Sequence, residues 1–458
     1  MADEVEVASV RGADLRAALL GAEEEEDDET DESKDETDES KSSPLGAGLA
    51  MFKCAVGAGS FALPYAFSKV GWALGIGLTF ALAALSTYTI LLLINAEREI
   101  VDRQGGKRLS YPALAGAAFP GAVLGGVNAA HAGCLAGVVA TCLGVCAAYL
   151  DFCAGVLPPL LIRLFGGDWT PAAAALLVAP AVFALACVDS KKVLSFGALL
   201  GNVAVGTGLA AVLVGGAVKG GAVFPGETTR LEGVPLFFGS TVFLFAIHIV
   251  VLPIAHGTRL AHGTGARASA RHKGPAFRNA VLGAFLAIAC VNALFGALAA
   301  LLFAGGACEG VCPNVLDNFA TTAATLDAVR VLLCLDLIFT TPLLLAAPRE
   351  ILEPTFLRWM ASRGCLRLGA VRLAFRGALV GLCLALALGI PNFSDMVNLV
   401  GGVCNSLMGF VIPPLIHLKL HPGRRPAYVA AHLAIAAAGV FAMVYTTYET
   451  ARSIAGRS

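Results

Sequence analysis

Three ionisable residues stand inside long apolar stretches of this sequence, namely His248, Asp336 and Asp151. Charged groups are costly inside a membrane, and residues of this kind usually mark an ion or substrate path. His248 titrates near neutral pH and is therefore a candidate proton carrier. Asp336 is a second candidate for loading and releasing a proton. Two ordinary roles compete with these: His248 bonded to nearby backbone, and Asp336 paired with Arg330 about a turn and a half away.

A broken helix supplies the second set of candidate groups. The segment from Val56 to Trp72 reads VGAGSFALPYAFSKVGW and lies in an apolar run long enough to cross a bilayer. A break at membrane depth is tolerated where it is buried in protein or lines a cavity, and its free N–H groups suit a carboxylate. We therefore expect four small residues to bind a ligand carboxylate: Gly57, Ala58, Gly59 and Ser60. Helix packing through small residues is the competing interpretation.

The second half of the chain repeats this pattern. The segment from Phe243 to Ala255 reads FLFAIHIVVLPIA, and its LPIA corresponds to the LPYA of the first segment. Carbonyls freed between Phe243 and Ala246 would accept bonds from a ligand ammonium. We expect Phe243 and Phe245 to wall the side-chain pocket, with a plain core role for at least one of them as the alternative. Paired interruptions in two halves predict a secondary transporter with its site at the repeat interface.

The composition is that of a polytopic membrane protein, with 458 residues, 57% apolar and 14% charged, and a mean hydropathy of +0.76. Residues 1–45 hold 17 acidic and 4 basic residues, and this composition predicts a disordered cytosolic tail. Residues 46–448 form the predicted membrane domain, and 449–458 a short C-terminal tail. Cys308 and Cys312 share a loop, and the sequence leaves open whether a disulfide joins them.

Apolar runs of about 20 residues predict eleven membrane spans. They lie at 46–68, 72–96, 127–161, 172–187, 193–216, 235–256, 278–304, 326–347, 373–390, 396–418 and 427–448. Nineteen Lys and Arg residues fall in the loops of one side and six on the other, which predicts a cytosolic N-terminus and an external or lumenal C-terminus. Spans one to five and six to ten then form two units of opposite orientation. The predicted fold is an all-α five-plus-five inverted repeat with broken helices 1 and 6 and one extra helix.

Sequence motifs of other protein classes are missing from the chain. It contains no Walker loop, GxSxG, HExxH or paired CxxC motif. Energy for transport must then come from an ion gradient or from the gradient of the substrate itself. We expect no enzyme activity, no cofactor, no metal site and no nucleic-acid partner.

Motifs in five spans occur in a fixed order between residues 46 and 448. The first is the Val56 to Trp72 segment, which is similar to VGAGVLGLPYAFKRTGW. The third-span motif consists of Gly144, Cys146, Tyr149 and Leu150, and the sixth-span motif of Phe237, Phe238, Gly239, Phe243, Phe245, Ala246, His248, Val250, Val251, Leu252 and Pro253. The eighth-span motif consists of Phe339, Thr340, Pro342, Leu343, Pro348, Glu350 and Ile351. The tenth-span motif consists of Ile390, Pro391, Asn392, Leu399, Val400, Gly401, Cys404, Phe410, Ile412, Pro413 and Pro414. Together they resemble the amino acid/auxin permease family, especially its proton-coupled and vacuolar neutral amino-acid transporters.

The resemblance implies secondary transport of neutral amino acids by alternating access, with proton symport as the expected coupling. It implies that Tyr149 closes over the substrate, although ordinary packing is the alternative. Sodium coupling stays open, because sodium-coupled relatives of this fold bind sodium where Thr340 and Thr341 stand. An amino-acid receptor on the same fold and an intramembrane acyltransferase using His248 are the competing functions. The implied location is the vacuolar or lysosomal membrane, or the plasma membrane.

Overall fold

The structure is a computed structural model of the chain. It describes residues 43–104, 108–124, 126–188, 191–220, 228–245, 247–258, 275–305, 308, 310–319, 324–364, 367–390 and 392–455. Most of the predicted acidic tail, and the candidate residue Ala246, lie outside the described residues.

The first span is broken where the sequence predicts a break. Helix α2 (Pro44–Ala55) begins behind Ser43, whose side chain accepts the N–H of Gly46, and it ends at Val56 in an extended conformation. A short 3₁₀ helix (Ala58–Ala62) and helix α3 (Leu63–Val70) follow, and the two halves are bent by 44°. N–H groups in the first turn of a helix have no acceptor within the helix, so proline, which lacks an N–H, is well tolerated there. Pro64 therefore favours the start of a new helix at this position.

The sixth span is broken in the same way. Helix α10 (Val234–Phe245) and helix α11 (His248–His256) are separated by two residues, of which Ile247 is described. The Ile247 N–H donates to the Phe245 carbonyl, and the Val250 N–H donates back to the Ile247 carbonyl. The chain therefore turns tightly between the two helices instead of continuing the α-helical ladder.

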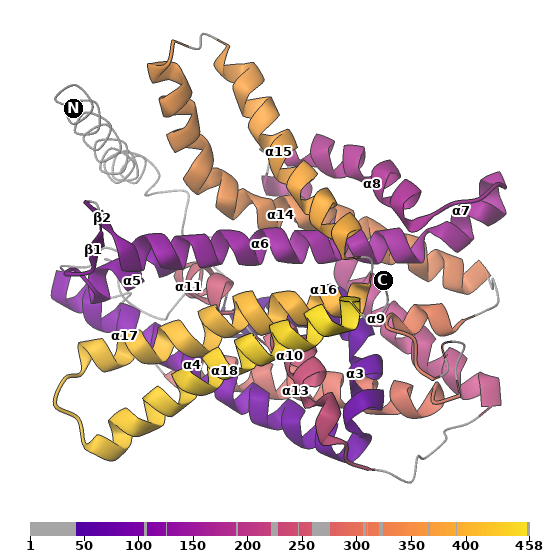
Figure 1. Cartoon of the computed structure of the whole chain (residues 1–458), viewed down its shortest axis with the longest axis horizontal. Coiled ribbons are helices and arrows are strands. Elements are labelled where there is room, and N and C mark those ends of the chain that lie inside the picture. Colours follow the sequence, from indigo (N-terminus) through magenta and orange to yellow (C-terminus); the bar gives the residue numbers. More distant parts are fainter. Residues whose placement is uncertain are drawn as a thin grey trace.

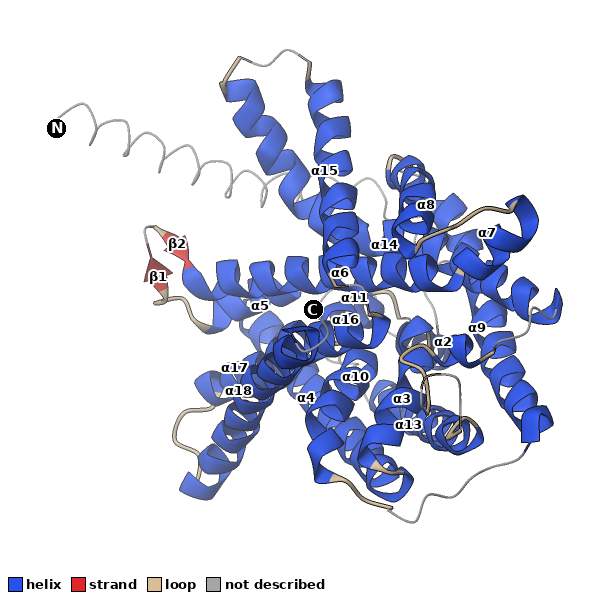
Figure 2. Cartoon of the chain, turned by 45° about the vertical axis from the view of Figure 1, so that its right-hand side comes forward, coloured by secondary structure: helices blue, strands red, loops and turns tan. Residues whose placement is uncertain are grey.

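The other elements are helices and one short antiparallel strand pair at one end of the bundle (Figures 1 and 2). In chain order they are α4 (Trp72–Gln104), α5 (Tyr111–Ala118), β1 (Val123–Leu124), β2 (Val127–Asn128), α6 (Ala129–Val156), α7 (Pro158–Phe165), α8 (Pro171–Ala186), α9 (Lys191–Gly220), a 3₁₀ helix (Leu231–Gly233), α13 (Pro275–Leu302), a second 3₁₀ helix (Val315–Asn318), α14 (Ala324–Ser362), α15 (Leu368–Gly389), α16 (Phe393–Leu399), two π-helical turns (Val400–Asn405 and Leu407–Val411), α17 (Ile412–Leu420) and α18 (Pro426–Ala455). Figure 1 shows α6 running along the whole bundle, with α14 and α15 forming a hairpin that projects beyond it.

Span counting supports a polytopic arrangement without fixing the number of eleven. Within the described residues, eight helices are long and apolar enough to cross a membrane, and the bent pair α2 with α3 makes a ninth. Two shorter apolar helices, Pro171–Ala186 and Val203–Val218, lie where the fourth and fifth spans are predicted. Helix α14 is 39 residues long and continues well past the predicted end of the eighth span at residue 347.

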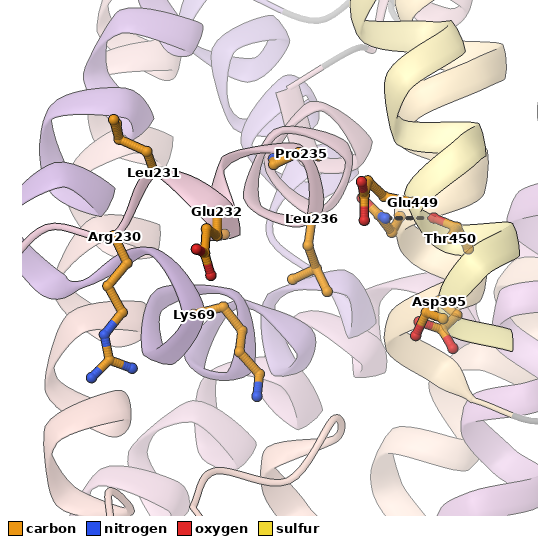
Figure 3. Close-up of a pocket in the computed structure, with 12 residues that line it drawn as sticks. Lys69, Arg230, Leu231, Glu232, Pro235, Leu236, Asp395, Glu449 and Thr450 are labelled. Carbon is orange, nitrogen blue, oxygen red and sulfur yellow. Dashed lines mark hydrogen bonds between the residues drawn. The ribbon is translucent and has the colours of Figure 1, made fainter. Parts of the chain in front are cut away.

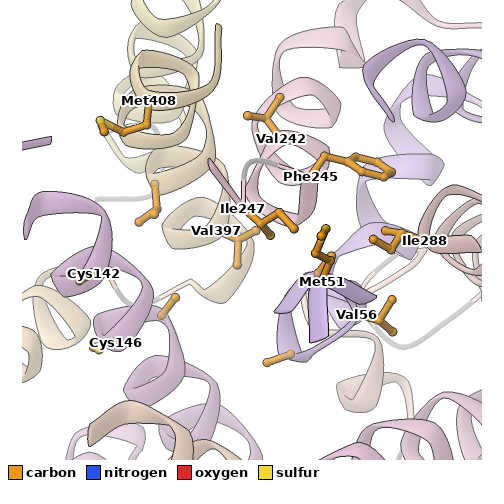
Figure 4. Close-up of a cluster of buried hydrophobic side chains, with 14 of the residues drawn as sticks. Met51, Val56, Cys142, Cys146, Val242, Phe245, Ile247, Ile288, Val397 and Met408 are labelled. Carbon is orange, nitrogen blue, oxygen red and sulfur yellow. The ribbon is translucent and has the colours of Figure 1, made fainter. Parts of the chain in front are cut away.

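The core lies where the broken helices meet the long ones. Helix α13 packs against α2, α3 and α4, while α14 packs against α6 and α9. Figure 4 shows Met51 of α2, Ile247 at the second break and Val397 of α16 facing one another in this core. The Phe152 ring of α6 makes a tilted contact with Phe61 and an edge contact with Phe393, which ties the first break to the third and tenth spans.

The loop after α13 contains a disulfide between Cys308 and Cys312. The sequence left this pairing open. Disulfides persist in oxidising compartments, and the loop lies on the side that the charge count predicts to be external or lumenal.

Candidate functional site

The first break places its small residues in two different environments. A Cβ added to Gly59 would lie 2.7 Å from Phe243 and 2.8 Å from Leu244, so Gly59 is packed directly against α10. A Cβ added to Gly57 would meet nothing within 4 Å. The open space therefore lies at Gly57, while Gly59 allows the two broken spans to approach each other. Ala58 is buried beside them and begins the 3₁₀ helix, whose first N–H groups have no acceptor within it.

The Ser60 side chain points to the seventh span. Its hydroxyl donates to Asn292 Oδ1 at 2.8 Å, and Asn292 Nδ2 donates to the Ile288 carbonyl of its own helix. Both Ser60 and Asn292 are fully buried. The hydroxyl that the sequence assigned to a ligand carboxylate thus already has a partner, and the contact fixes the first break against α13.

The second break also differs in detail from the prediction. The Phe243 carbonyl accepts a bond from Asn405 Nδ2 at 3.3 Å, while the Asn405 Oδ1 atom is buried without a hydrogen bond among the described residues. The Phe243 ring is half-buried beside Gly59. Phe245 is fully buried and stacks with Phe285, with ring centroids 6.2 Å apart. Phe243 is thus the aromatic residue placed at the break, and Phe245 belongs to the core.

Asp336 lies at a junction of four helices. It is 9% exposed, and its Oδ1 atom accepts the Thr340 hydroxyl at 3.2 Å. A Cβ added to Gly201 of α9 would lie only 1.6 Å from the same oxygen, so the carboxylate sits directly over that glycine. The charge of Asp336 also acts on Lys53 of α2 and on Tyr149 of α6. Asp336, Lys53 and Tyr149 therefore form one electrostatic cluster beside the first break.

The neighbouring candidates of the eighth span have their own partners. The Thr341 hydroxyl donates to the Leu337 carbonyl at 2.7 Å, and the Thr341 carbonyl accepts from the Cys146 thiol of α6 at 3.6 Å. Arg330, the alternative partner of Asp336, pairs with Asp327 instead. The competing role of Asp336 as the partner of Arg330 is therefore not what the structure shows.

His248 lies on the opposite side of its break from Phe243 and is fully buried. Its Nε2 atom lies 2.9 Å from the Thr89 hydroxyl, which is also 3.1 Å from the Leu85 and Ser86 carbonyls. Since that hydroxyl donates to a carbonyl, it accepts from His248, which assigns the proton to Nε2. The Nδ1 atom is then a buried acceptor without a partner among the described residues. The bonding partner is a side chain, not the backbone expected as the ordinary alternative.

Asp151, the third ionisable candidate, is buried on α6, and its Oδ2 atom has no hydrogen bond among the described residues. The charges that act on it come from Asp395 and Asp317, so it lies in a separate, acidic environment. Within the described part of the chain, no group of His, Cys, Asp and Glu residues could hold a metal ion.

Two further polar residues of the site escaped the sequence reasoning: Asn292 and Asn405. Each is an amide in an otherwise apolar span, and polar side chains at that depth usually have a structural or functional partner. That signal was present in the sequence, but only the fold shows that both amides reach the two breaks.

The comparison that decides the family covers nearly the whole chain. Residues 40–452 match the family described as Transmembrane amino acid transporter protein. The chain belongs to this family. The resemblance inferred from the motifs is thereby confirmed, and membership of a family of transporters confirms that the chain is not an enzyme.

Relatives within the family come from plants, animals and fungi. Amino acid transporter AVT3B of Arabidopsis thaliana is 26% identical over 388 residues, which cover 81% of this chain and 83% of that protein. Proton-coupled amino acid transporter-like protein pathetic of Drosophila melanogaster is 23% identical over 381 residues, covering 81% and 76%. Vacuolar amino acid transporter 3 of Saccharomyces cerevisiae is 26% identical over 426 residues, covering 90% of this chain and 56% of that protein.

Among solved structures, the inward-facing conformation of Mhp1 superposes on this protein with a TM-score of 0.56. The match covers 91% of this chain and 92% of the Mhp1 chain. At 13% identity this similarity concerns the fold alone. It confirms the predicted inverted-repeat transporter fold with broken first and sixth helices, while the count of eleven spans stays a prediction.

Proposed function

We propose that this protein carries neutral amino acids across a membrane by alternating access and moves a proton with them. The observation that carries the proposal is the meeting of the two broken helices. Gly59 brings the first break against Phe243 of the sixth span, and Gly57 beside it faces open space. A ligand can reach backbone N–H groups there, which gives a carboxylate both donors and the positive end of a helix dipole.

The substrate carboxylate binds the N–H groups of Gly57, Ala58 and Gly59 in this proposal, because the Ser60 N–H already donates to the Gly57 carbonyl at 3.0 Å. The substrate ammonium donates to oxygens at the second break in this proposal. These are the Phe243 carbonyl and the Asn405 Oδ1 atom, which has no hydrogen bond among the described residues. Phe243 and the half-buried Tyr149 supply aromatic surface for the substrate side chain. The Ser60 hydroxyl is excluded from direct contact, because Asn292 already accepts its proton.

Proton coupling is assigned to Asp336. When its carboxylate is ionised, it attracts the ammonium of Lys53 on α2. A proton taken up on the carboxylate removes that attraction between Asp336 and α2. The first half of the broken span can then move relative to the eighth span, which is the motion that alternating access needs. The name of the Drosophila relative includes proton coupling, which supports the assignment of a proton as the coupled ion.

The membrane is proposed to be that of a vacuole or lysosome. The yeast relative carries the word vacuolar in its name, and protons that move out of an acidic compartment of that kind would drive symport of amino acids to the cytosol. Colocalisation of the tagged full chain with a vacuolar or lysosomal marker tests this, and labelling confined to the cell surface would exclude it.

Flux measurements on the purified full chain in proteoliposomes test the function. A panel of radiolabelled neutral amino acids is offered with an imposed pH gradient, a sodium gradient or neither. We expect accumulation with the pH gradient and little effect of sodium. Accumulation driven by sodium alone would transfer the coupling to Thr340 and Thr341. Binding without flux would identify a receptor, and chemical alteration of the label an enzyme.

Substitution of Asp336 by Asn separates coupling from substrate transport. Asn keeps a side-chain acceptor for Thr340 but cannot take up a proton, so amino-acid exchange should persist while concentrative uptake is lost. Asp168→Asn, in an exposed loop, is the control and should behave as wild type. Normal concentrative uptake by Asp336→Asn would place the coupling group elsewhere.

A further inference from the structure

The α14–α15 hairpin carries more positive than negative charge where it leaves the bundle. Its outer part, residues 348–364 and 367–376, contains six arginines and two glutamates. Arg349 and Arg376 fix the base of this part on α8, because each donates to the Ala186 carbonyl, at 2.5 Å and 3.5 Å. The hairpin tip, residues 356–364 and 367–372, projects beyond the other helices in Figure 1. A partner can therefore reach the tip without displacing a helix of the bundle.

The hairpin tip contains no Asp or Glu of its own within the described residues. Glu353, nearer the base, accepts bonds from Arg372 and Arg376 at 3.0 Å and 2.9 Å. Three arginines of the tip make no ion pair with a carboxylate in the described part of the chain, and two of them, Arg363 and Arg367, are exposed. The third is the half-buried Arg358, whose Nε atom also has no hydrogen bond there. The tip thus presents unbalanced positive charge.

The opposite charge is concentrated in the same chain before the first helix. Between Glu23 and Glu39, 13 of the 17 residues are Asp or Glu, and Lys34 is the one basic residue of that segment. Glu39 stands five residues before Pro44, where α2 begins. Carboxylates and guanidinium groups form short, charge-assisted and often bidentate hydrogen bonds. The acidic segment therefore matches the hairpin tip in charge and in hydrogen-bonding groups.

Helix α2 and the hairpin leave the bundle at the same end. The 3₁₀ helix that follows α2 (Ala58–Ala62) contacts the 3₁₀ helix that precedes α14 (Val315–Asn318). Farther along both helices, Lys53 of α2 and Asp336 of α14 are close enough for their charges to interact. Both helices therefore lead away from the first break in one direction, α2 toward its start and α14 toward its end.

The acidic segment is long enough to reach the hairpin tip. From Lys53, α2 extends nine residues back to Pro44, which is about 14 Å of helix. From Asp336, α14 extends 26 residues to Ser362, which is at most about 39 Å, so the tip lies about 25 Å farther out. Glu23 stands 21 residues before Pro44, and a flexible chain of that length spans about 25 Å on average.

The opposite end of the bundle offers no comparable surface. The cavity there has a volume of about 810 Å³, and Figure 3 shows Lys69 and Arg230 in its lining together with Glu232, Asp395 and Glu449. Charges of both signs share this lining. An acidic segment would meet repulsion as well as attraction there, whereas the hairpin tip only attracts it.

We propose that residues 23–39 dock on the hairpin tip, with their carboxylates on Arg358, Arg363 and Arg367. Because the segment belongs to the same chain, its effective concentration at the tip is on the order of millimolar. An anionic membrane surface also attracts exposed arginines, but it is not tethered to them. The docked segment joins the start of α2 to α14 and α15, and so restrains the half of the first span that carries Lys53.

Zero-length cross-linking in the full chain tests the contact without measuring transport. A carbodiimide joins a carboxylate to an amine but not to a guanidinium, so Arg363→Lys supplies an amine at the tip and keeps the charge. Arg424→Lys is the matched control. Both arginines are exposed and lie over an aromatic ring, at 4.9 Å from the Trp359 centre and 5.6 Å from the Tyr428 centre. Each variant is held in phosphatidylcholine nanodiscs, and mass spectrometry quantifies the cross-linked peptides.

We expect Arg363→Lys to cross-link to residues 23–39 roughly tenfold more than Arg424→Lys does, because the tether favours one surface. Arg367→Lys, which places an amine on the other side of the hairpin, should also cross-link. Adding Arg367→Gln to Arg363→Lys should lower the yield about two- to fivefold, the loss typical of one exposed ion pair. In about 1 M salt, where the Debye length is about 3 Å, the yield should fall to that of the control.

Three results would overturn the proposal. The first is an equal yield from Arg363→Lys and Arg424→Lys, or a yield that Arg367→Gln leaves unchanged. The second is cross-linking of the acidic segment mainly to the native Lys273, which would place it on the basic stretch between Arg259 and Lys273. The third is loss of the cross-links when phosphatidylglycerol is added to the nanodiscs, which would identify an anionic membrane surface as the occupant of the tip.

Discussion

The position of Asp336 can be tested through the glycine beneath it. A Cβ at residue 201 would lie 1.6 Å from the Asp336 Oδ1 atom, whereas real Cβ contacts are at least 3.0 Å. Gly201→Ala must therefore displace the carboxylate by about 1.4 Å, and the 3.2 Å bond from Thr340 is lost. A hydrogen bond to a charged group contributes about 1.5–3 kcal/mol. We expect proton-driven accumulation to fall roughly ten- to hundredfold, while exchange of amino acid persists.

Uptake into proteoliposomes under a fixed pH gradient measures this effect. Gly206→Ala is the matched control, because the same methyl group on the same helix meets nothing within 4 Å and should leave uptake unchanged. In an Asp336→Asn background, Gly201→Ala should add little further loss, since the two changes act on one group. Wild-type accumulation by Gly201→Ala, or equal losses in both glycine variants, would refute the assignment of coupling to Asp336.

Three other variants test the remaining contacts. Gly57→Leu should lower amino-acid binding at least tenfold without preventing membrane insertion. The control Gly77→Leu, at another glycine in open space, should bind amino acid normally. Equilibrium binding to the two purified variants measures the difference. Asn292→Leu leaves the Ser60 hydroxyl buried without a partner and should lower stability by about 1–3 kcal/mol, and Ser60→Ala should recover much of that loss in a thermal unfolding assay. Removing the disulfide with Cys308→Ser should cost about 2 kcal/mol for so short a loop, and an impermeant reductant should reach the intact disulfide only from the side where a C-terminal tag is accessible.

Most of the fold could be predicted from the sequence, because the signals for spans and breaks are local and do not depend on which helices pack together. Apolar runs predicted the spans, and the Gly57 and Pro64 signals placed the first break correctly, because helix propensity and lipid solvation act along the chain. The extension of α14 to Ser362 was missed. The helix ends at Ser362, just before Gly364 with its positive φ of 79°, and residues 348–362 carry too many charges to be recognised as part of a span.

The site was harder to predict, because its details depend on which helix faces which. Gly57 and Gly59 read alike in sequence, yet one faces open space and the other packs against Phe243. The sequence offered Ser60 as a ligand group, but Asn292 reaches it from 232 residues away. The charge of Asp336 on α14 acts on Lys53 of α2, which stands 283 residues earlier in the chain. Spacing along the chain holds no information about such tertiary pairs.

The two titratable candidates differ in the way that proton coupling requires. A coupling group must exchange its proton with water on each side of the membrane. Its interaction with a helix that moves during transport must also differ between the protonated and the ionised state. His248 is completely enclosed, and its one described bond joins it to Thr89, which is neutral in either state. Asp336 retains some exposure and acts on Lys53, which belongs to the half of the broken span that alternating access would move. Protonating Asp336 removes an attraction between two elements, whereas protonating His248 only adds a charge to the core. The electrostatic arrangement therefore favours Asp336 as the group that links proton loading to movement of α2.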